Sequence, residues 1–309
     1  MGKLRRFRAA ASSWWREATR YDIWNVGVIA LDRELAHVDE LRRLPTPRWL
    51  PPRRSLYYVA DPFPYRDGGR DWLLVEEYGH PKGVYGRIAR VDVDADPPVF
   101  ETVIQTPTHL SYPFTFEEEH VTYCAPEMAA SGGCTIYRLD AGGAWTPAHH
   151  ILAGHRLVDP TFVRHNGRWW LFATDRSGGG SLTLHVFHAD AIAGPWTPHQ
   201  RNPVKVDRAS ARPAGRPFAI GEQLYRPAQD CRIGYGAAVH VMRIDELTPE
   251  AFREETVLRL EPDPGWPYPD GLHTLVIDGR RVYIDAKRSH HDAFRWLKVW
   301  TVSEWEARR

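Results

Sequence analysis

Cysteine is scarce in this sequence and follows no recognisable spacing. The 309 residues contain only Cys124, Cys134 and Cys231, an odd number without a C-x-x-C pair. Disulfide frameworks and zinc sites usually need paired cysteines, so neither is expected here. We predict free thiols, mostly buried, in a protein of the reducing cytoplasm.

Long apolar runs are also missing. Residues 1–20 are rich in Lys and Arg, but no apolar run follows them that would complete a secretory signal, and no segment has the length of a transmembrane helix. We predict a basic N-terminal helix or tail over residues 1–22. Two interpretations remain open: a solvated segment, or a peripheral contact with a membrane surface or a partner that would use Trp14 and Trp15.

An excess of charge of either sign is absent as well, since the net charge is +1. A nucleic-acid partner is therefore not expected, because it would require a strongly basic field. The sequence also contains no G-x-S-x-G, Walker or dinucleotide-binding motif, and no cluster with clear metal-ligand spacing. We predict no cofactor and no metal.

Tryptophan and proline are, by contrast, abundant. The 13 Trp and 25 Pro favour an all-β protein, because Pro punctuates loops and strand starts and Trp suits strands. Five segments repeat one pattern: a short strand opened by a polar residue, usually followed by Pro, then a turn and a second apolar strand. The polar first residues are Asp61, Tyr112, Asp159, Arg216 and His273.

The spacing of these five residues, 47 to 57 positions, indicates the architecture. Further strands follow each hairpin, and about four antiparallel strands per repeat are typical of a propeller. We predict one five-bladed β-propeller over residues 23–309. The strand at 24–30 is left over and is predicted to close the ring as the outer strand of the last blade, whose third strand is expected at 296–302. Two stacked sheets with coincidental spacing are the alternative.

Several motifs within these strands resemble those of one protein family. They are ADPFPY (60–65), LSYPFTFEE (110–118), DPTFV (159–163), RWWLFAT (168–174), YRPAQDC (225–231) and GLHTL (271–275). Together they are similar to the propeller domain at the N-terminus of plant glucosamine inositolphosphorylceramide transferases, over residues 24–290. The resemblance implies a five-bladed propeller and a carbohydrate or glycoconjugate ligand.

The blade pattern and the turn at Gly194-Pro195-Trp196 also resemble, more distantly, the five-bladed glycosidases of glycoside hydrolase families 43 and 32. That resemblance implies an Asp of blade one as base or nucleophile, a second Asp that tunes pKa values, and a Glu of a later blade as acid. Asp61 matches the blade-one position. Tyr112 is the first residue of the blade-two repeat, where a second Asp is missing, and Asp159 is the first residue of the blade-three repeat, so the other two roles do not transfer directly.

Polar residues at the start of every inner strand predict a ligand site on the axis. Inner strands line the axis of a propeller, so their first residues meet at one end. The second strands of four repeats end in carboxylates, namely Glu76, Glu127, Asp230 and Asp285. Buried polar groups need partners or a function. We predict as substrate-binding residues Tyr112, Arg216, Asp230 and His273, with Trp266 and Tyr268 as a platform on which a sugar ring stacks.

The candidate catalytic residues are Asp61, Glu127 and Asp159. Glycoside hydrolysis needs one protonated and one ionised carboxyl group on two sides of the bond. Asp61 is assigned as the base, and the acid is left open between Glu127, Asp159 and His273. For Asp61 or Asp159 taken singly, a purely structural role as a turn-capping residue before Pro is the alternative.

Two functions follow from these residues and resemblances. The first is a carbohydrate-active enzyme, a glycosidase-like hydrolase or related sugar-processing enzyme that uses paired carboxylates. The alternative is a non-catalytic glycan-binding or glycoconjugate-binding domain that works with a glycosyltransferase or a polysaccharide biosynthesis system. An interaction propeller with an idle axis ranks last.

Overall fold

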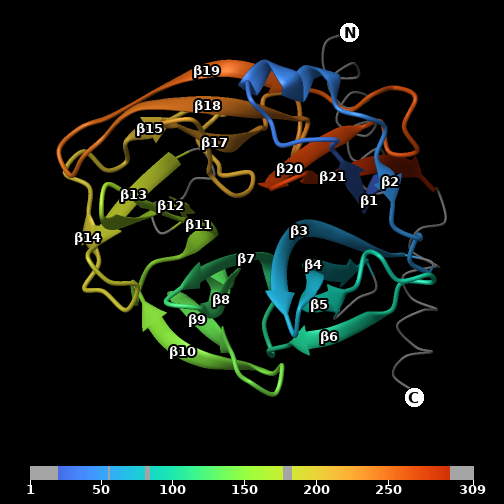
Figure 1. Cartoon of the computed structure of the whole chain (residues 1–309), viewed down its shortest axis with the longest axis horizontal. Helices are drawn as coiled ribbons and strands as arrows, with labels where there is room; N and C mark the ends of the chain where they lie inside the picture. The colour runs from blue at the N-terminus through green and yellow to red at the C-terminus, as the bar shows by residue number, and fades with distance from the viewer. Residues whose placement is uncertain (1–19, 55, 81–83, 177–182, 293–309) are drawn as a thin grey trace, which may run out of the picture.

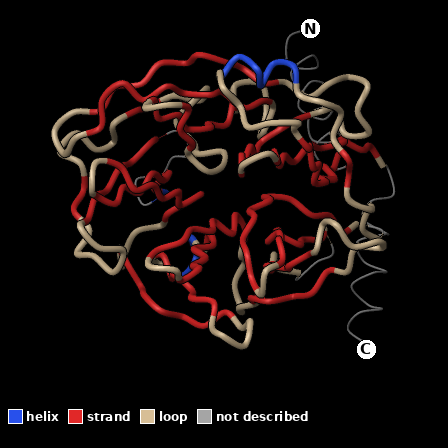
Figure 2. The backbone as a smooth tube through the Cα atoms, viewed as in Figure 1, coloured by secondary structure: helices blue, strands red, loops and turns tan. Residues whose placement is uncertain are grey.

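We describe the protein from a computed structural model over residues 20–54, 56–80, 84–176 and 183–292. Its strands form five antiparallel sheets around one axis, so the predicted five-bladed β-propeller is confirmed (Figures 1 and 2). No helix within these ranges is long and apolar enough to cross a membrane.

Four blades follow one another along the chain, each built from an inner strand outwards (Figure 1). Blade one consists of β3 (Tyr57–Asp67), β4 (Arg70–Gly79), β5 (Arg87–Val91) and β6 (Phe100–Ile104). Blade two consists of β7 (Ser111–Glu118), β8 (Val121–Glu127), β9 (Cys134–Leu139) and β10 (Trp145–Ile151). Blade three consists of β11 (Leu157–His165), β12 (Arg168–Asp175), β13 (Thr183–Ala189) and the short β14 (Thr197–Pro198) and β15 (Lys205–Val206). Blade four consists of β16 (Phe218–Ile220), β17 (Gln223–Asp230), β18 (Ala238–Leu247) and β19 (Phe252–Leu260).

Blade five joins the two ends of the described chain. Its strands are β20 (Gly271–Asp278), β21 (Arg281–His291), β1 (Arg20–Ala30) and β2 (Arg48–Trp49). Because β1 pairs with β21 along its whole length, the N-terminal strand closes the last blade, as predicted. Strand β1 takes the third position in the blade, and β2 lies outside it. The prediction that β1 is the outermost strand is therefore wrong by one position.

Two predictions, one near each end of the chain, extend beyond the described residues. The strand predicted at 296–302 lies outside the described residues, and so do residues 1–19 of the predicted basic segment. Strand β1 begins at Arg20, within the segment predicted as a helix or tail. Two short 3-10 helices, η1 (Val38–Arg43) and η2 (Ala129–Ser131), complete the described elements.

The largest part of the core lies between the inner strands of neighbouring blades. Phe63, Phe114 and Phe162, one from each of blades one to three, are all buried and belong to one cluster. Each such aromatic side chain contributes about 1.5–3 kcal/mol by leaving water. All three cysteines are free, with Cys124 and Cys134 buried, which confirms the prediction of unpaired thiols.

Candidate functional site

The inner strands of blades one to three share an uncommon backbone conformation at their predicted first residues. Asp61, Tyr112 and Asp159 have φ angles of 52°, 45° and 52°, and each precedes a proline. Strand pairing is interrupted at the same place in each blade. Such residues cost about 1–3 kcal/mol each and persist only where their surroundings hold them. Three equivalent strained positions around one axis mark this end of the propeller as a built site.

The backbone N–H groups of these residues donate to carboxylates around the axis. Asp61 donates to Oδ2 of Asp285 at 2.8 Å, and Tyr112 donates to Oδ2 of Asp61 at 3.1 Å. Asp159 donates to Oε2 of Glu127 at 3.3 Å. The strained conformation thereby fixes the positions of the carboxylates, and Asp61, Asp159 and Asp285 are no more than 5% exposed.

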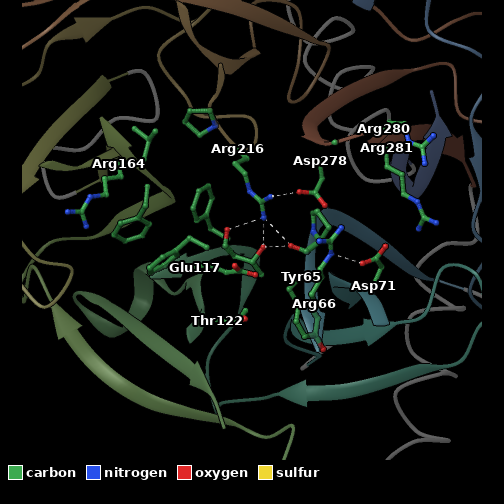
Figure 3. A pocket seen from close by; sticks show the side chains of 18 of the residues that line it. Tyr65, Arg66, Asp71, Glu117, Thr122, Arg164, Arg216, Asp278, Arg280 and Arg281 are labelled. Atoms are coloured by element: carbon green, nitrogen blue, oxygen red, sulfur yellow. Dashed lines mark hydrogen bonds and ion pairs between the residues drawn. The ribbon is translucent and has the colours of Figure 1, made fainter. Parts of the chain in front are cut away.

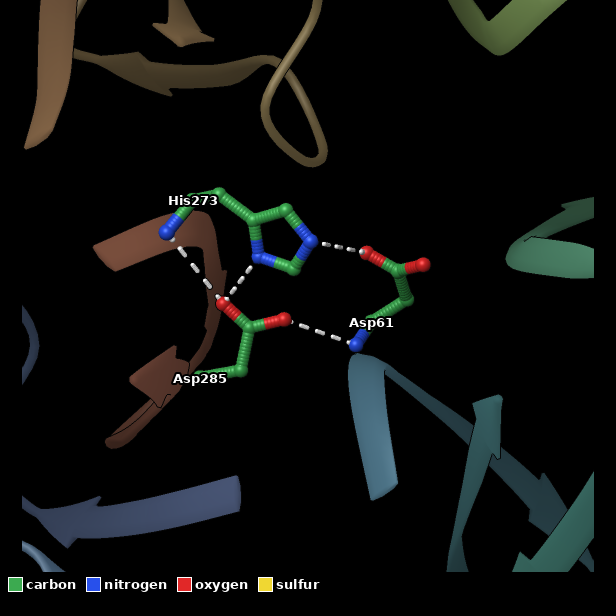
Figure 4. A group of neighbouring side chains, drawn as sticks. All are labelled: Asp61, His273 and Asp285. Atoms are coloured by element: carbon green, nitrogen blue, oxygen red, sulfur yellow. Dashed lines mark hydrogen bonds and ion pairs between the residues drawn. The ribbon is translucent and has the colours of Figure 1, made fainter. Parts of the chain in front are cut away.

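Asp61, His273 and Asp285 form the centre of the cluster (Figure 4). Nδ1 of His273 lies 2.6 Å from Oδ1 of Asp285, and Nε2 of His273 lies 3.6 Å from Oδ1 of Asp61. The hydroxyl of Thr274 donates to the same Asp61 oxygen at 3.0 Å. Asp285 therefore fixes the imidazole ring so that Nε2 faces Asp61.

Burial sets the protonation of this pair. It raises the pKa of Asp61 to about 7; the charge of His273 opposes the shift, and the carboxylates of Glu76 and Asp285 add to it. For His273, burial lowers the pKa, but the charges of Asp285 and Asp61 outweigh it and the pKa ends above its ordinary value. Asp61 thus exchanges its proton close to neutral pH, and His273 holds its proton more tightly than an ordinary imidazole, which suits acid–base chemistry.

Glu127 and Asp159 form a second carboxyl pair, and the two groups have different hydrogen-bond and charge partners. The guanidinium of Arg212 donates to both oxygens of Asp159, and Nε2 of Gln229 donates to Oδ2 at 3.0 Å. Burial raises the pKa of Glu127 well above its ordinary value, and the charge of Asp159 adds to the shift. Glu127 consequently holds its proton to a higher pH than an ordinary Glu, while Asp159 pairs with Arg212.

Two aromatic rings enclose His273. Trp24 stacks on the imidazole with 4.0 Å between ring centroids, and Tyr235 meets it edge-on at 5.2 Å. Tyr235 is 45% exposed, and the guanidinium of Arg212 lies 5.0 Å from its ring centroid. Tyr235 therefore lies between the buried cluster and solvent, and we call this solvent-facing side of the cluster the axial mouth.

Asp61, His273 and Asp285 also carry donor atoms within 4.8 Å of one another, close enough to share a metal ion. Asp285, however, already accepts hydrogen bonds from the backbone N–H groups of Asp61, His273 and Thr274 and pairs with Nδ1 of His273. A cation would have to displace these donors. The three residues therefore fit a hydrogen-bonded relay better than a metal site.

Tyr112 is buried between blades two, three and four. Its ring is fully buried, and its hydroxyl lies 2.8 Å from Oγ1 of Thr161 and accepts a hydrogen bond from the N–H of Gly215 at 2.7 Å. A ligand at the mouth would not reach the Tyr112 hydroxyl directly. The residue supports the site by joining blades two, three and four.

Arg216 lies away from the other predicted ring residues and lines a pocket together with Glu117 and Asp278 (Figure 3). Its Nη2 donates to the carbonyl oxygens of Pro64 and Thr115, each three residues beyond Asp61 or Tyr112, and so about 10 Å further along the inner strands. Nη1 donates to Asp278 at 3.3 Å. The reason is that β16 begins only at Phe218, and the loop before it brings Arg212 to the cluster instead. Arg216 lines a separate cavity of about 960 Å³.

Three more predicted binding residues lie outside the cluster. Asp230 points away from the axis to Arg232 and Arg259; burial raises its pKa, but hydrogen bonds from these arginines lower it further than burial raises it. Trp266 and Tyr268 pack on Trp49 in blade five, with ring centroids at 5.5 and 5.0 Å. Their rings support blade five and are not placed to stack on a sugar at the axial mouth.

The sequence missed residues that the structure brings to the site. Gln229 is next to Asp230, and alternation along β17 directs Gln229 to Asp159. The register of the YRPAQDC motif could have revealed this. Arg212 and Tyr235 lie in loops outside the repeated strand pattern.

A family model described as the N-terminal region of glucosamine inositolphosphorylceramide transferase 1 matches residues 53–264. Two curated proteins named glucosamine inositolphosphorylceramide transferase 1 match over 207 residues: that of Oryza sativa subsp. japonica with 32% identity and that of Arabidopsis thaliana with 31%. The match covers 65% of this chain and 28% and 27% of these relatives. The chain thus spans little more than a quarter of their length.

Solved structures share the fold at low identity. A family 117 glycoside hydrolase from the marine bacterium Zobellia galactanivorans aligns with a TM-score of 0.53 and 12% identity, over 86% of this chain and 90% of that one. A GH43_1 enzyme from Xanthomonas citri aligns with a TM-score of 0.51 and 14% identity, over 76% and 87%. At these identities the likeness establishes the propeller fold alone.

Proposed function

This chain belongs to the family of the glucosamine inositolphosphorylceramide transferase 1 N-terminal region, and on that premise we propose that its axial cluster is a carbohydrate site in which Glu127 acts as acid and Asp61 as base on a glycosidic bond. The observation that carries the proposal is that three buried carboxyl groups have different electrostatic surroundings. Burial raises the pKa values of Asp61 and Glu127, whereas Arg212 pairs with Asp159.

The proposed reaction is hydrolysis by general acid and base. Glu127 gives its proton to the departing glycosidic oxygen, and Asp61 takes a proton from the water whose oxygen bonds to the anomeric carbon. Asp61 ends protonated and Glu127 ionised, and exchange with solvent restores both. His273, oriented by Asp285, lies beside Asp61 and stabilises its carboxylate during the step.

The surroundings of the cluster suit a sugar ligand. The exposed face of Tyr235 offers an apolar surface for one side of a sugar ring, and Arg212 and Glu127 offer partners for its hydroxyl groups. Because the curated relatives are named for glucosamine and inositolphosphorylceramide, glycoconjugates that contain a hexosamine or an inositol are the ligand class we propose to test first.

A second candidate is a glycan-binding domain without catalysis. Two observations favour it: the match to the curated relatives covers only a quarter or so of their length, and Tyr112 takes the position in blade two where the second Asp of a glycosidase-like site is missing. Binding alone would use the same residues, with Asp61 and Glu127 as hydrogen-bond partners of sugar hydroxyl groups.

An NMR time course separates these functions. Wild type, Asp61→Asn and Glu127→Gln are incubated with a panel of oligosaccharides, aryl glycosides and glycosyl-inositols, with Asp278→Asn at the far end of the axis as the matched control. New anomeric signals from wild type and control only would support hydrolysis. Ligand line-broadening by all four proteins without turnover would support the binding domain. Neither effect with any compound would contradict both.

A further inference from the structure

A row of aromatic and imidazole rings leads away from the axial cluster across blades one and five. Glu76 and Tyr78 alternate along β4 and so share one face of that strand, and His80 follows directly after its last residue, Gly79. Tyr58 of β3 lies directly opposite Tyr78 in the strand register, and the ring centroids of the two are 5.5 Å apart. The row thus begins at Glu76, whose charge contributes to the raised pKa of Asp61.

Rings from neighbouring segments extend the row on both sides. His109, just before blade two, meets Tyr78 edge-on at 5.1 Å, and its Nε2 lies 3.3 Å from Oε1 of Glu76. Tyr21 of blade five meets His80 at 5.6 Å. Tyr21 also stacks on His290, its partner in the strand register, at 5.2 Å with an angle of 18° between the rings.

We call the residues Tyr21, Tyr58, Tyr78, His80, His109 and His290 the aromatic row. All six are partly exposed. None of the three tyrosines belongs to a hydrophobic core cluster found among the described residues. Packing of the core therefore does not account for this accumulation of rings, and part of each ring lies at the surface.

We propose that the aromatic row is a set of sugar subsites that continues the axial site, so that the ligand is an oligosaccharide chain and not a single sugar. The inference rests on the proposed carbohydrate function. Sugar rings present apolar C–H faces that pack on aromatic rings. The terminal unit lies at the axial mouth, the next units lie over Tyr58 and Tyr78, and Tyr21 and His290 contact the units furthest from the axis.

Two variants and one control test the row. Tyr78→Leu keeps an apolar side chain of similar reach and removes the aromatic face, and Tyr21→Ala acts at the far end. Tyr123→Ala is the matched control: this tyrosine of blade two is partly exposed, stacks on Phe116 at 5.3 Å and lies near His149, but is not in the row. The melting temperature of each variant establishes that it is folded, and His290→Ala replaces Tyr21→Ala if the latter does not fold.

The proteins are first applied to a glycan array that carries mono- to hexasaccharides, and the Kd of each bound glycan is then measured by calorimetry. We expect longer chains to bind wild type more tightly. We expect Tyr21→Ala and Tyr78→Leu to weaken binding of chains of three or more units about fivefold, as for the loss of one aromatic contact, without changing monosaccharide binding. Tyr123→Ala should have no effect on either.

The outcomes separate the row from the site on which it rests. Two results would overturn the proposed role of the aromatic row while leaving the axial site in place. The first is binding that does not depend on the length of the glycan chain, and the second is that the row variants bind long chains as tightly as wild type. No binding of any glycan by wild type would overturn the carbohydrate function and the row together.

Discussion

Oδ1 of Asp285 and Nδ1 of His273 lie 2.6 Å apart, and both side chains are almost completely buried. The imidazole cannot turn without losing this hydrogen bond, so its Nε2 stays directed at Asp61. Asp285 also accepts the backbone N–H of Asp61 through Oδ2. The position of the proposed base therefore depends on a positioning residue that lies behind it.

Replacement of Asp285 by Asn should destabilise the protein strongly. The amide group would turn a donor towards N–H groups that now meet a carboxylate, and we expect a loss of about 3 kcal/mol in the free energy of unfolding. Urea denaturation measures this loss. Asp190→Asn is the control, because the Asp190 side chain is 90% exposed and its replacement should change stability by less than about 0.5 kcal/mol. Equal stabilities of the two variants would contradict the structural role of Asp285.

Stability should also depend on pH through Asp61. Its folded pKa of about 7 lies above the ordinary value of 3.8, so the folded state holds the proton more tightly than the unfolded chain. The resulting stabilisation is fully present below about pH 4 and is lost as the pH rises through 7. The raised pKa values of Glu127 and His273 act in the same direction.

Asp61→Asn removes this dependence, because an amide does not ionise. We expect the free energy of unfolding of wild type, relative to the variant, to fall as the pH rises from 4 to 8. Urea titrations of both proteins across that range measure the difference. A difference that stays constant or grows with pH would show that Asp61 does not keep its proton through burial.

The loop that carries Tyr235 should be sensitive to a single methyl group at Gly236. A Cβ there would lie 2.7 Å from Cβ of His273 and from the Trp24 ring, and the φ angle of 58° is unfavourable for other residues. Gly236→Ala should therefore shift the loop, destabilise the protein by about 1–3 kcal/mol and weaken glycan binding. Gly234→Ala in the same loop meets nothing within 4 Å and should leave both unchanged. Similar behaviour of the two variants would contradict the tight packing of Gly236 on His273.

Tyr235 and Trp266 offer a direct comparison of two proposed sugar platforms. The structure places Tyr235 at the axial mouth and Trp266 against Trp49. We expect Tyr235→Ala to lower glycan affinity by about 1 kcal/mol, or roughly fivefold, and Trp266→Ala to lower the melting temperature while leaving affinity unchanged. Calorimetric titration and thermal unfolding of both variants check this. If only Trp266→Ala loses affinity, the platform predicted from the sequence is the right one.

The repeat pattern was sufficient to predict the blades because each inner strand carries its own local signals. A polar residue before Pro, an Asn-Gly or Asp-Gly turn and an apolar second strand mark blades one and three individually. The same signals placed Asp61 and Asp159 at equivalent positions, and the structure holds both at one end of the axis. Closure by the N-terminal strand followed because a strand without a blade has to pair somewhere.

In blade four the repeat pattern pointed to the wrong residue. Arg216-Pro217 has the same pattern of a polar residue before proline as the other blades. In the structure, however, the irregular segment before β16 places Arg212 beside Asp159, and Arg216 lies at the other end of the axis. Tyr235 lies in a loop of blade four, and its ring packs against His273 of blade five. Contacts of this kind depend on the path of a loop between blades, and no periodic pattern encodes that path.

A crystal structure of the Asp61→Asn variant soaked with the glycan panel tests the central claim most directly. The account predicts a sugar at the axial mouth beside Tyr235, with a glycosidic or hydroxyl oxygen within hydrogen-bond distance of Glu127 and of residue 61. A sugar bound only in the cavity around Arg216, with the axial cluster untouched, would contradict it.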